Sequence, residues 1–474
     1  MAPGFYSFPK ESRPLSTWLQ DMQDHHLMNH RTTPGLPARA DIVIIGSGLT
    51  GTTVAKHCVE TWPEKKVVVV EAREFCSGAT GRNAGHCKPD QWRGFKEYED
   101  DFGTEQALKI LENEQQTWSS VVNYVRSKNV DCELWVGDTL DVPITWESAD
   151  DAKEIFERYK AAGGNIDQIK ITNDPAKARE FGFELLTTMK VSRIKDAKAC
   201  YAWPASTVHP WKLAAHVMSE NLKKGVNLQT RSTVTQVVKS QKQLGNWTVK
   251  TGRGDIECAQ VVHATNAYSP ALEPSLRGLI KPTPHMCNLI VPPVSFTGSK
   301  ALQNSYGILL PSGGLITINP RIPTHGPVLF GGSNPGQAEF YRWLENNPER
   351  ATDDDIVGFP SVTEAVKDFT NAQLRGWPGD VPADYRREWS GIIAMSSDGL
   401  PFVGQLPGLP GQWVCAGHNG HGMARIFTAA PGLVKLMAGL PWADTKLPEA
   451  FEITLARVEK LKGLEKDGVV RSRL

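Results

Sequence analysis

Three glycines spaced as GxGxxG follow a short apolar run and could bind the phosphates of a dinucleotide. The apolar run is DIVII (41–45), and the glycines are Gly46, Gly48 and Gly51. Glycine at these positions permits a tight turn, lets the backbone approach a pyrophosphate and allows a helix to pack closely on a strand. Glu71 lies twenty residues beyond Gly51, where a carboxylate can accept hydrogen bonds from a ribose hydroxyl. The pattern predicts a dinucleotide-binding site.

These residues need a strand–helix–strand unit to position them. Residues 41–45 have the continuous apolar character of a strand that is buried on both faces of a parallel sheet. Apolar residues recur at helical spacing over 54–59, and VVVV (67–70) predicts a second buried strand. The glycine turn would then lie at the N-terminus of the helix, whose free N–H groups and positive dipole favour phosphate.

Two further blocks of the chain have β character. Alternating residues and turn signals predict hairpin strands over 232–238 and 246–251, with a buried strand after them. Residues 101–200 are largely helical in pattern, and 105–128 is the clearest amphipathic stretch. The segment 275–385 is rich in Pro, Gly and β-forming residues, so it predicts a second sheet.

Composition and charge exclude several classes of partner. Lys and Arg total 52, as do Asp and Glu, so no global field attracts nucleic acid or an anionic membrane. No run of about 18 apolar residues predicts a membrane span. The eight cysteines form no CxxC pair, and we expect reduced, buried thiols. His418 and His421 lack a third ligand, so we expect no metal.

Five separated motifs resemble the D-amino-acid oxidase-like family of FAD-dependent oxidoreductases. The resemblance spans nearly all of residues 40–440, and the second motif is similar to the SGRNGG loop of the γ-glutamylputrescine oxidase-like amine oxidases in that family. The motifs are GSGLTG (46–51) with Glu71, SGATGRNAG (77–85), Val234 followed by VVHATNAYSP (261–270), EWSGIIAMSSDGLPFVG (388–404) and CAGHNGHGMA (415–424).

The resemblance implies an α/β fold. It consists of an FAD-binding Rossmann-type domain, assembled from discontinuous segments, and a substrate domain of mixed β-sheet with helices. We expect the FAD-binding domain to comprise residues 39–110, 200–275 and 385–445, and the substrate domain to comprise 111–199 and 276–384. Residues 1–38 would form an N-terminal extension and 446–474 a C-terminal tail.

The resemblance also assigns cofactor contacts along the chain. Val234 would present its backbone to the adenine, and the loop 77–85 would follow the ribityl chain and the flavin edge. Residues 417–423 would direct backbone N–H groups at the part of the flavin that becomes negative on reduction. The predicted cofactor-binding residues are Gly46, Gly48, Leu49, Gly51, Glu71, Ala72, Arg73, Ser77, Ala79, Thr80, Arg82, Asn83, Ala84, Gly85, His86, Val234, Ala264, Thr265, Gly391, Asp398, Gly417, Asn419, Gly420, His421, Gly422 and Met423.

The implied reaction oxidises a C–N bond of a small-molecule amine. A hydride passes from the carbon next to a neutral amine nitrogen to flavin N5, the imine product hydrolyses, and oxygen reoxidises the flavin and gives hydrogen peroxide. No side chain need act as an obligatory base, because a desolvated site can favour the neutral amine. The candidate catalytic residues are His86, His285, Tyr306 and His421.

Two departures from the family pattern refine these expectations. Many amino-acid oxidases of the family carry a carboxylate-binding arginine four residues after the Trp of WxG, and here that position is Ile393. This favours an amine over a simple α-amino acid, unless Arg386, Arg387 or Arg321 binds the carboxylate from another angle. The positions at which relatives attach FAD covalently are Gly391 and Arg82, so we expect FAD to be non-covalent, with His86 and Cys87 the only nearby nucleophiles.

Alternatives to an amine oxidase stay open. One is an FAD-dependent amino-acid oxidase, or a dehydrogenase of specialised metabolism that uses another electron acceptor. An NAD(P)-dependent dehydrogenase would leave the Arg82 loop and the glycine-rich turn 417–422 without a function. The C-terminal residues Ser472, Arg473 and Leu474 resemble the SKL peroxisomal address. We therefore expect a peroxisomal import receptor to bind them and the protein to be peroxisomal; without such binding it would be cytoplasmic.

Overall fold

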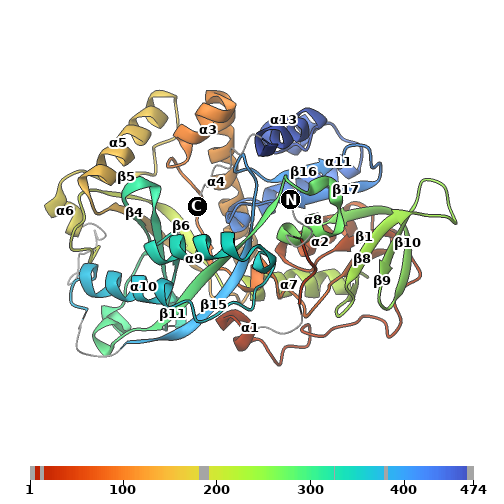
Figure 1. Ribbon diagram of the computed structural model, residues 1–474, viewed down its shortest axis with the longest axis horizontal. Helices are drawn as coiled ribbons and strands as arrows, with labels where there is room; N and C mark the ends of the chain where they lie inside the picture. Colours follow the sequence, from red (N-terminus) through yellow and green to blue (C-terminus); the bar gives the residue numbers. More distant parts are fainter. Residues whose placement is uncertain (1–5, 11–14, 181–191, 325, 378–382, 467–474) are drawn as a thin grey trace.

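The computed structural model describes residues 6–10, 15–180, 192–324, 326–377 and 383–466. Two β-sheets form the framework, and Figure 1 shows one on the right, with β1, β8, β9 and β10, and the other on the left, with β4, β6, β11 and β15. Helices pack around both sheets. No described helix is long and apolar enough to cross a membrane.

The first sheet contains the predicted strand–helix–strand unit. β1 (Arg39–Ile45) pairs in parallel with β2 (Val67–Val70), and α2 (Leu49–Thr61) connects them. The eight-stranded sheet has the path β16-β17-β10-β1-β2-β7, and β8 and β9 extend β10 as an antiparallel ribbon. The other strands are β7 (Asn227–Gln229), β8 (Val234–Lys239), β9 (Trp247–Thr251), β10 (Gly254–His263), β16 (Phe402–Gln405) and β17 (Gln412–Ala416).

Helices α2, α7 (Pro210–Lys223) and α11 (Ile426–Met437) pack together beside the first sheet. β1 and β2 are almost wholly apolar over residues 42–45 and 67–70, as strands covered on both faces must be. The predicted Rossmann-type arrangement is thereby confirmed. Helix α11 continues through Pro431.

The second sheet has nine strands and mixed pairing. Its path is β15-β11-β14-β13-β12-β4-β6-β3, with β5 beside β6. The strands are β3 (His86–Cys87), β4 (Trp135–Pro143), β5 (Lys170–Thr172), β6 (Cys200–Thr207), β11 (Lys281–Val291), β12 (Ser305–Leu309), β13 (Leu315–Pro320), β14 (Val328–Gly332) and β15 (Asp384–Met395). Its long antiparallel pair is β11 with β15.

The remaining helices surround the second sheet and the ends of the chain. Helices α9 and α10 pack on each other, as do α3 and α4. The bounds are α1 (Thr17–Asp21), α3 (Phe95–Phe102), α4 (Thr104–Ser127), α5 (Trp146–Ala161), α6 (Pro175–Glu180), α8 (Ser269–Leu272), α9 (Pro335–Asn346), α10 (Pro360–Gln373), α12 (Trp442–Thr445) and α13 (Leu455–Lys466).

Two features differ from the segment-by-segment expectation. The largely helical block 101–200 also contains β4 and β5, because their pairing with β6 is a long-range contact that local periodicity does not reveal. The second sheet also includes β3, β6 and β15, which come from ranges that the sequence analysis assigned to the FAD-binding domain. These strands carry the chain across from one sheet to the other.

Candidate active site

A cavity of about 680 Å³ extends from the glycine-rich turn of the first sheet to the second sheet. Its lining includes Glu71 and Val234 near the first sheet, and Thr317 and Gly331 on strands of the second. The volume falls within the range of about 300–1,000 Å³ that is typical of ligand sites. One continuous cavity thus connects the predicted dinucleotide residues with a second compartment.

The first turn of α2 faces the cavity through a close backbone approach. Gly48 caps the helix without a side-chain hydrogen bond, and Gly48 and Leu49 line the cavity. Gly51 does not line it, but a Cβ there would overlap the carbonyl oxygen of Gly46, so only glycine lets the turn and the helix pack together. The first turn, which borders the cavity, fits a phosphate group.

Glu71 lies at the end of β2 and organises this turn. One carboxylate oxygen accepts from the backbone N–H and the hydroxyl of Ser47, at 2.9 and 2.7 Å, and the other accepts from Arg73 N at 3.0 Å. The carboxylate also lines the cavity. It therefore holds the turn while presenting acceptor capacity to a ribose, as the spacing predicted.

The loop 77–85 is fixed to both sheets. Thr80 Oγ1 accepts from Leu49 N at 3.0 Å, and this ties the loop to the first turn of α2. Trp389 Nε1 donates to the carbonyl of Arg82 at 2.8 Å, and a Cβ at Gly391 would lie 3.1 Å from the Arg82 Cβ. The WxG segment of β15 therefore packs directly on Arg82, which explains the glycine at 391.

The Arg82 side chain is buried in an ion-paired cluster. The Asp354 carboxylate accepts hydrogen bonds from Arg73 Nη1 and Nη2, at 2.9 and 2.8 Å, and its Oδ2 lies 3.2 Å from Arg82 Nε. Arg82 also donates to the backbone carbonyls of Asp354 and Ser390, at 2.9 and 2.8 Å. Buried charges of this kind are stable only when paired and hydrogen-bonded. Arg82 thus fastens the loop to the 354 segment and to β15.

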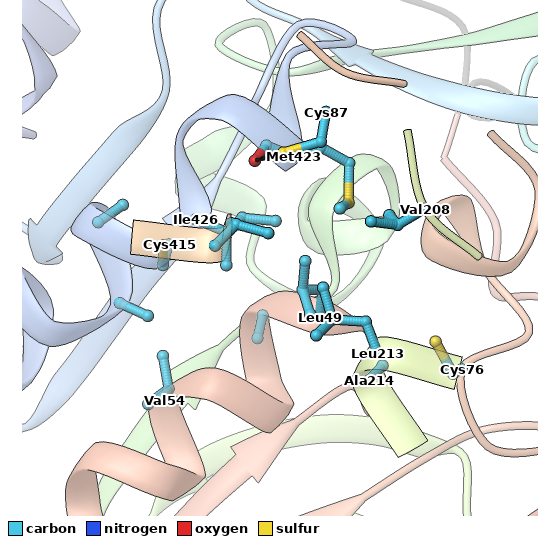
Figure 2. Close-up of a cluster of buried hydrophobic side chains, with 14 of the residues drawn as sticks. Leu49, Val54, Cys76, Cys87, Val208, Leu213, Ala214, Cys415, Met423 and Ile426 are labelled. Carbon is cyan, nitrogen blue, oxygen red and sulfur yellow. Dashed lines mark hydrogen bonds between the residues drawn. The ribbon is translucent and has the colours of Figure 1, made fainter. Parts of the chain in front are cut away.

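Figure 2 shows the apolar packing beneath this loop, where Leu49, Cys76, Leu213 and Ala214 belong to one buried cluster with Cys87, Met423 and Ile426. Cys87 does not line the cavity, and its thiol donates to the carbonyl of Met423 at 3.6 Å. Burial raises the pKa of the Cys87 thiol to about 12, so it is protonated. All eight cysteines are buried and unpaired, as expected.

Residues 417–425 close the cavity from the side of α11. Glu114 of α4 is fully buried and accepts from Asp90 N at 2.7 Å and Arg425 Nε at 2.9 Å. Its Oε2 also lies 3.3 Å from Nδ1 of His421. Burial alone would raise the pKa of Glu114, but its interactions with His421 and with the Arg425 guanidinium outweigh burial and lower this pKa to about 2. Glu114 is therefore ionised and orients His421.

The structure places most of the predicted cofactor-binding residues around the cavity. All line it except Gly51, Ser77, Gly85, Asp398 and Gly417. Asp398 lies apart, in an ion pair with Arg457 at 2.8 Å, and Ser77 contributes its carbonyl to Arg82. The glycine turn, the ribose carboxylate, the loop and the 419–423 segment thus share one cavity, and they fit an extended dinucleotide such as FAD.

Three of the four candidate catalytic residues reach the cavity, and Tyr306 does not. His86, His285 and His421 line it, and neither ring nitrogen of His86 has a hydrogen-bond partner among the residues that the structure describes. Burial lowers the pKa of His86 to about 3 and that of His285 to about 4, so both imidazoles are neutral near pH 7. Tyr306 lies instead in the second hydrophobic core cluster.

Several lining residues were not predicted from the sequence. Phe8 and Pro9 of the N-terminal extension line the cavity, as do Lys88 and Arg93 just beyond the loop. No sequence pattern indicates that residues 6–10 line a cavity. Lys88, however, directly follows the predicted FAD loop, and this position could have identified it. Among the described residues, no group of three or more His, Cys, Asp or Glu is placed to hold a metal.

The fold and the cavity together fit an enzyme that uses an extended dinucleotide. Residues 41–440 match the family model described as FAD dependent oxidoreductase, and the chain belongs to this family. It is an FAD-dependent enzyme, as its motifs predicted.

Relatives and solved structures agree with this assignment. The chain is 23% identical to gamma-glutamylputrescine oxidoreductase of Escherichia coli over 414 residues, 84% of each chain, and 20% identical to the oxidoreductase OrdL of Rhizobium meliloti over 466 residues, 94% of each. Glycine oxidase from Geobacillus kaustophilus has a TM-score of 0.63 at 18% identity, covering 88% of this chain and 99% of that one. L-Amino acid deaminase from Proteus myxofaciens, in complex with anthranilate, has a TM-score of 0.65 at 14% identity, covering 94% and 98%. At these identities, the two structures show a shared fold.

Proposed function

We propose that the protein oxidises the C–N bond of a small-molecule amine. FAD, when bound, supplies the chemistry by accepting a hydride from the carbon next to the amine nitrogen. Gamma-glutamylputrescine oxidoreductase and glycine oxidase are named for an amine and an amino acid, which supports this class of substrate. The observation that carries the proposal is the pairing of His421 with the ionised Glu114 at the wall of the cavity.

His421 is suited to take a proton from a substrate ammonium. Glu114 Oε2 faces Nδ1 at 3.3 Å, which favours the tautomer in which Nδ1 donates and Nε2 accepts. An amine must be neutral before its α-hydrogen can leave as hydride, and a carboxylate-oriented imidazole lowers the cost of removing its proton. The neutral His86 and His285 add acceptors without positive charge that would repel an ammonium.

The experiment is anaerobic reduction of the FAD-loaded protein by a panel of primary amines, secondary amines and amino acids. Reduction should follow a pH profile that rises as an enzyme group loses a proton, and His421→Asn should move that profile while FAD content stays unchanged. His216→Asn is the matched control, because His216 packs on Tyr124 outside the cavity. An unchanged profile in the His421 variant would remove this residue from the mechanism.

We also propose that FAD is held without a covalent bond. Cys87 is protonated and turned into the core, and the Arg82 guanidinium is bound to Asp354. Acid precipitation should release the yellow colour into the supernatant. A pellet that stays yellow would point to His86, the nucleophile that lines the cavity.

Oxygen is the proposed electron acceptor, and a dehydrogenase that uses another acceptor is the alternative. The two are separated by admitting air to the amine-reduced protein and measuring peroxide. One equivalent of peroxide formed within seconds supports an oxidase, whereas slow reoxidation that an artificial acceptor accelerates supports a dehydrogenase.

Peroxisomal import remains a proposal that rests on the C-terminal Ser-Arg-Leu sequence, which lies outside the described residues. A fluorescent fusion at the N-terminus should collect in peroxisomes and become cytosolic when residues 472–474 are deleted. An unchanged distribution after the deletion would refute this targeting.

A further inference from the structure

Two cations, Lys88 and Arg93, share a single buried carboxylate at the wall of the cavity. Asp141 on β4 is fully buried, with Lys88 Nζ at 2.5 Å from Oδ1 and Arg93 Nη1 at 3.1 Å from Oδ2. Both cations line the cavity and Asp141 does not. Their side chains are only 11% and 26% exposed, so they are largely withdrawn from solvent.

This cluster has more donors than its carboxylate can use. Lys88 has three N–H donors and Arg93 has five. Within the described residues, Asp141 is the hydrogen-bond acceptor for both side chains, and Arg93 reaches it through Nη1 alone. Lys88 also lies 5.0 Å from the centre of the Trp203 ring, which supports its charge but takes no hydrogen bond. Because both side chains line the cavity, their remaining donors are available to a ligand there.

The neighbouring carboxylates do not use those donors. Asp90 accepts from the backbone N–H groups of Trp92, Arg93 and Gly94, at 3.3, 2.9 and 2.9 Å. Glu114 is engaged by Arg425, by His421 and by the backbone N–H of Asp90. Burial lowers the pKa of Lys88, and Asp141 only partly offsets this, so a second anion would stabilise its charged form.

We propose that Lys88 and Arg93 bind a carboxylate of the substrate and thereby determine its class as an amine that also carries an acidic group. The substrate part of this inference rests on the proposed function, whereas the anion site itself does not. A planar guanidinium beside an ammonium matches the two oxygens of a carboxylate, and charge-assisted hydrogen bonds of this kind are strong in a desolvated site.

The anion site of Lys88 and Arg93 does not coincide with position 393, at which many family members carry their carboxylate-binding arginine. Ile393 of β15 lines the cavity where many amino-acid oxidases would carry the carboxylate-binding residue. Arg321, once a candidate substitute, is paired with Glu133 at 2.8 Å and does not line the cavity. Carboxylate binding has moved to the segment that follows the FAD loop, next to Asp90, whose backbone N–H donates to the Glu114 carboxylate oxygen that also faces His421.

The test is a spectral titration of the oxidised, FAD-loaded protein with pentanoate and with the uncharged pentanamide at constant ionic strength. Pentanoate should perturb the flavin spectrum saturably, and pentanamide should bind at least tenfold more weakly. Arg93→Gln leaves Asp141 paired with Lys88 and should weaken pentanoate binding roughly ten- to hundredfold, the range for a hydrogen bond to a charged group. Lys88→Met should do the same where it folds.

Lys96→Met is the matched control, because Lys96 pairs with Glu154 outside the cavity. It should keep wild-type affinity for pentanoate. Equal binding of pentanoate and pentanamide, or wild-type affinity in Arg93→Gln, would overturn the inference. If pentanoate binds as expected but no amine reduces the flavin, the proposed amine oxidation fails while the anion site stands. In reduction assays, 5-aminopentanoate should be preferred over pentylamine by wild type and not by Arg93→Gln.

Discussion

Replacing Glu114 with glutamine should destabilise the protein by about 3 kcal/mol. Glu114 is fully buried and is the carboxylate partner of Arg425, which is fully buried too. The substitution keeps the shape and one acceptor oxygen but leaves Arg425 without its counter-charge. Breaking a buried pair by removing one partner costs about 3–5 kcal/mol.

The pKa of Glu114 gives an independent magnitude. Its ordinary value is 4.5 and its folded value is about 2. At about 1.36 kcal/mol for each pKa unit, this difference corresponds to roughly 3 kcal/mol. Because the folded pKa is the lower one, the contribution is complete above pH 4.5 and is lost as the pH falls towards 2. The Gln variant should therefore lose stability at pH 7 and much less at acid pH.

The assay is denaturant-induced unfolding of the FAD-loaded protein, followed by tryptophan and flavin fluorescence at several pH values. Glu449→Gln is the control, because Glu449 also bonds to α4 but pairs with Lys109 at the surface. It should change the free energy of unfolding by less than about 1 kcal/mol. A Glu114 variant within about 0.5 kcal/mol of wild type, with an unchanged acid profile, would refute this reasoning.

Three further variants test the cofactor half of the cavity. Glu71→Gln should weaken FAD binding roughly ten- to hundredfold, measured by fluorescence titration of the apoprotein, because a charged acceptor for the ribose is lost; unchanged affinity would mean that Glu71 only holds the turn. Gly51→Ala should yield protein without FAD, because its Cβ meets the Gly46 carbonyl, whereas Gly35→Ala meets nothing within 4 Å and should keep normal FAD content. Phe8→Ala should raise the FAD dissociation rate roughly fivefold, because the partly buried Phe8 lines the cavity and its apolar contact is lost; an unchanged rate would show that residues 6–10 do not retain FAD.

Most residues that line the first-sheet side of the cavity could be predicted because they lie in short contiguous motifs. A glycine triplet between a buried strand and a helix is typical of a dinucleotide-binding turn, and the carboxylate that binds the ribose follows at a characteristic spacing. The structure confirms the strand, the helix and the parallel pairing around Gly46–Gly51. The loop residues came instead from the family resemblance: Ala79, Thr80, Arg82, Asn83, Ala84 and His86 line the cavity, whereas Ser77 and Gly85 do not.

The residues around the proposed substrate part of the cavity could not be predicted in this way. Glu114 is one of several charged residues in α4, and no local pattern reveals that it alone meets Arg425 from the far end of the chain. Tyr306 shows the converse error. All of β12 is buried, so alternation does not say which face meets the cavity. Gly307 faces Lys88 and Asp141. Its neighbour Tyr306 therefore points to the other face of β12, into a hydrophobic core.

The most direct test of the central claim is anaerobic titration of the purified FAD-loaded protein with the amine panel. The account predicts that at least one amine bleaches the oxidised-flavin absorption stoichiometrically, and that amines carrying a carboxylate do so at the lowest concentrations. A protein whose flavin is reduced by dithionite but by no amine or amino acid in the panel would contradict it.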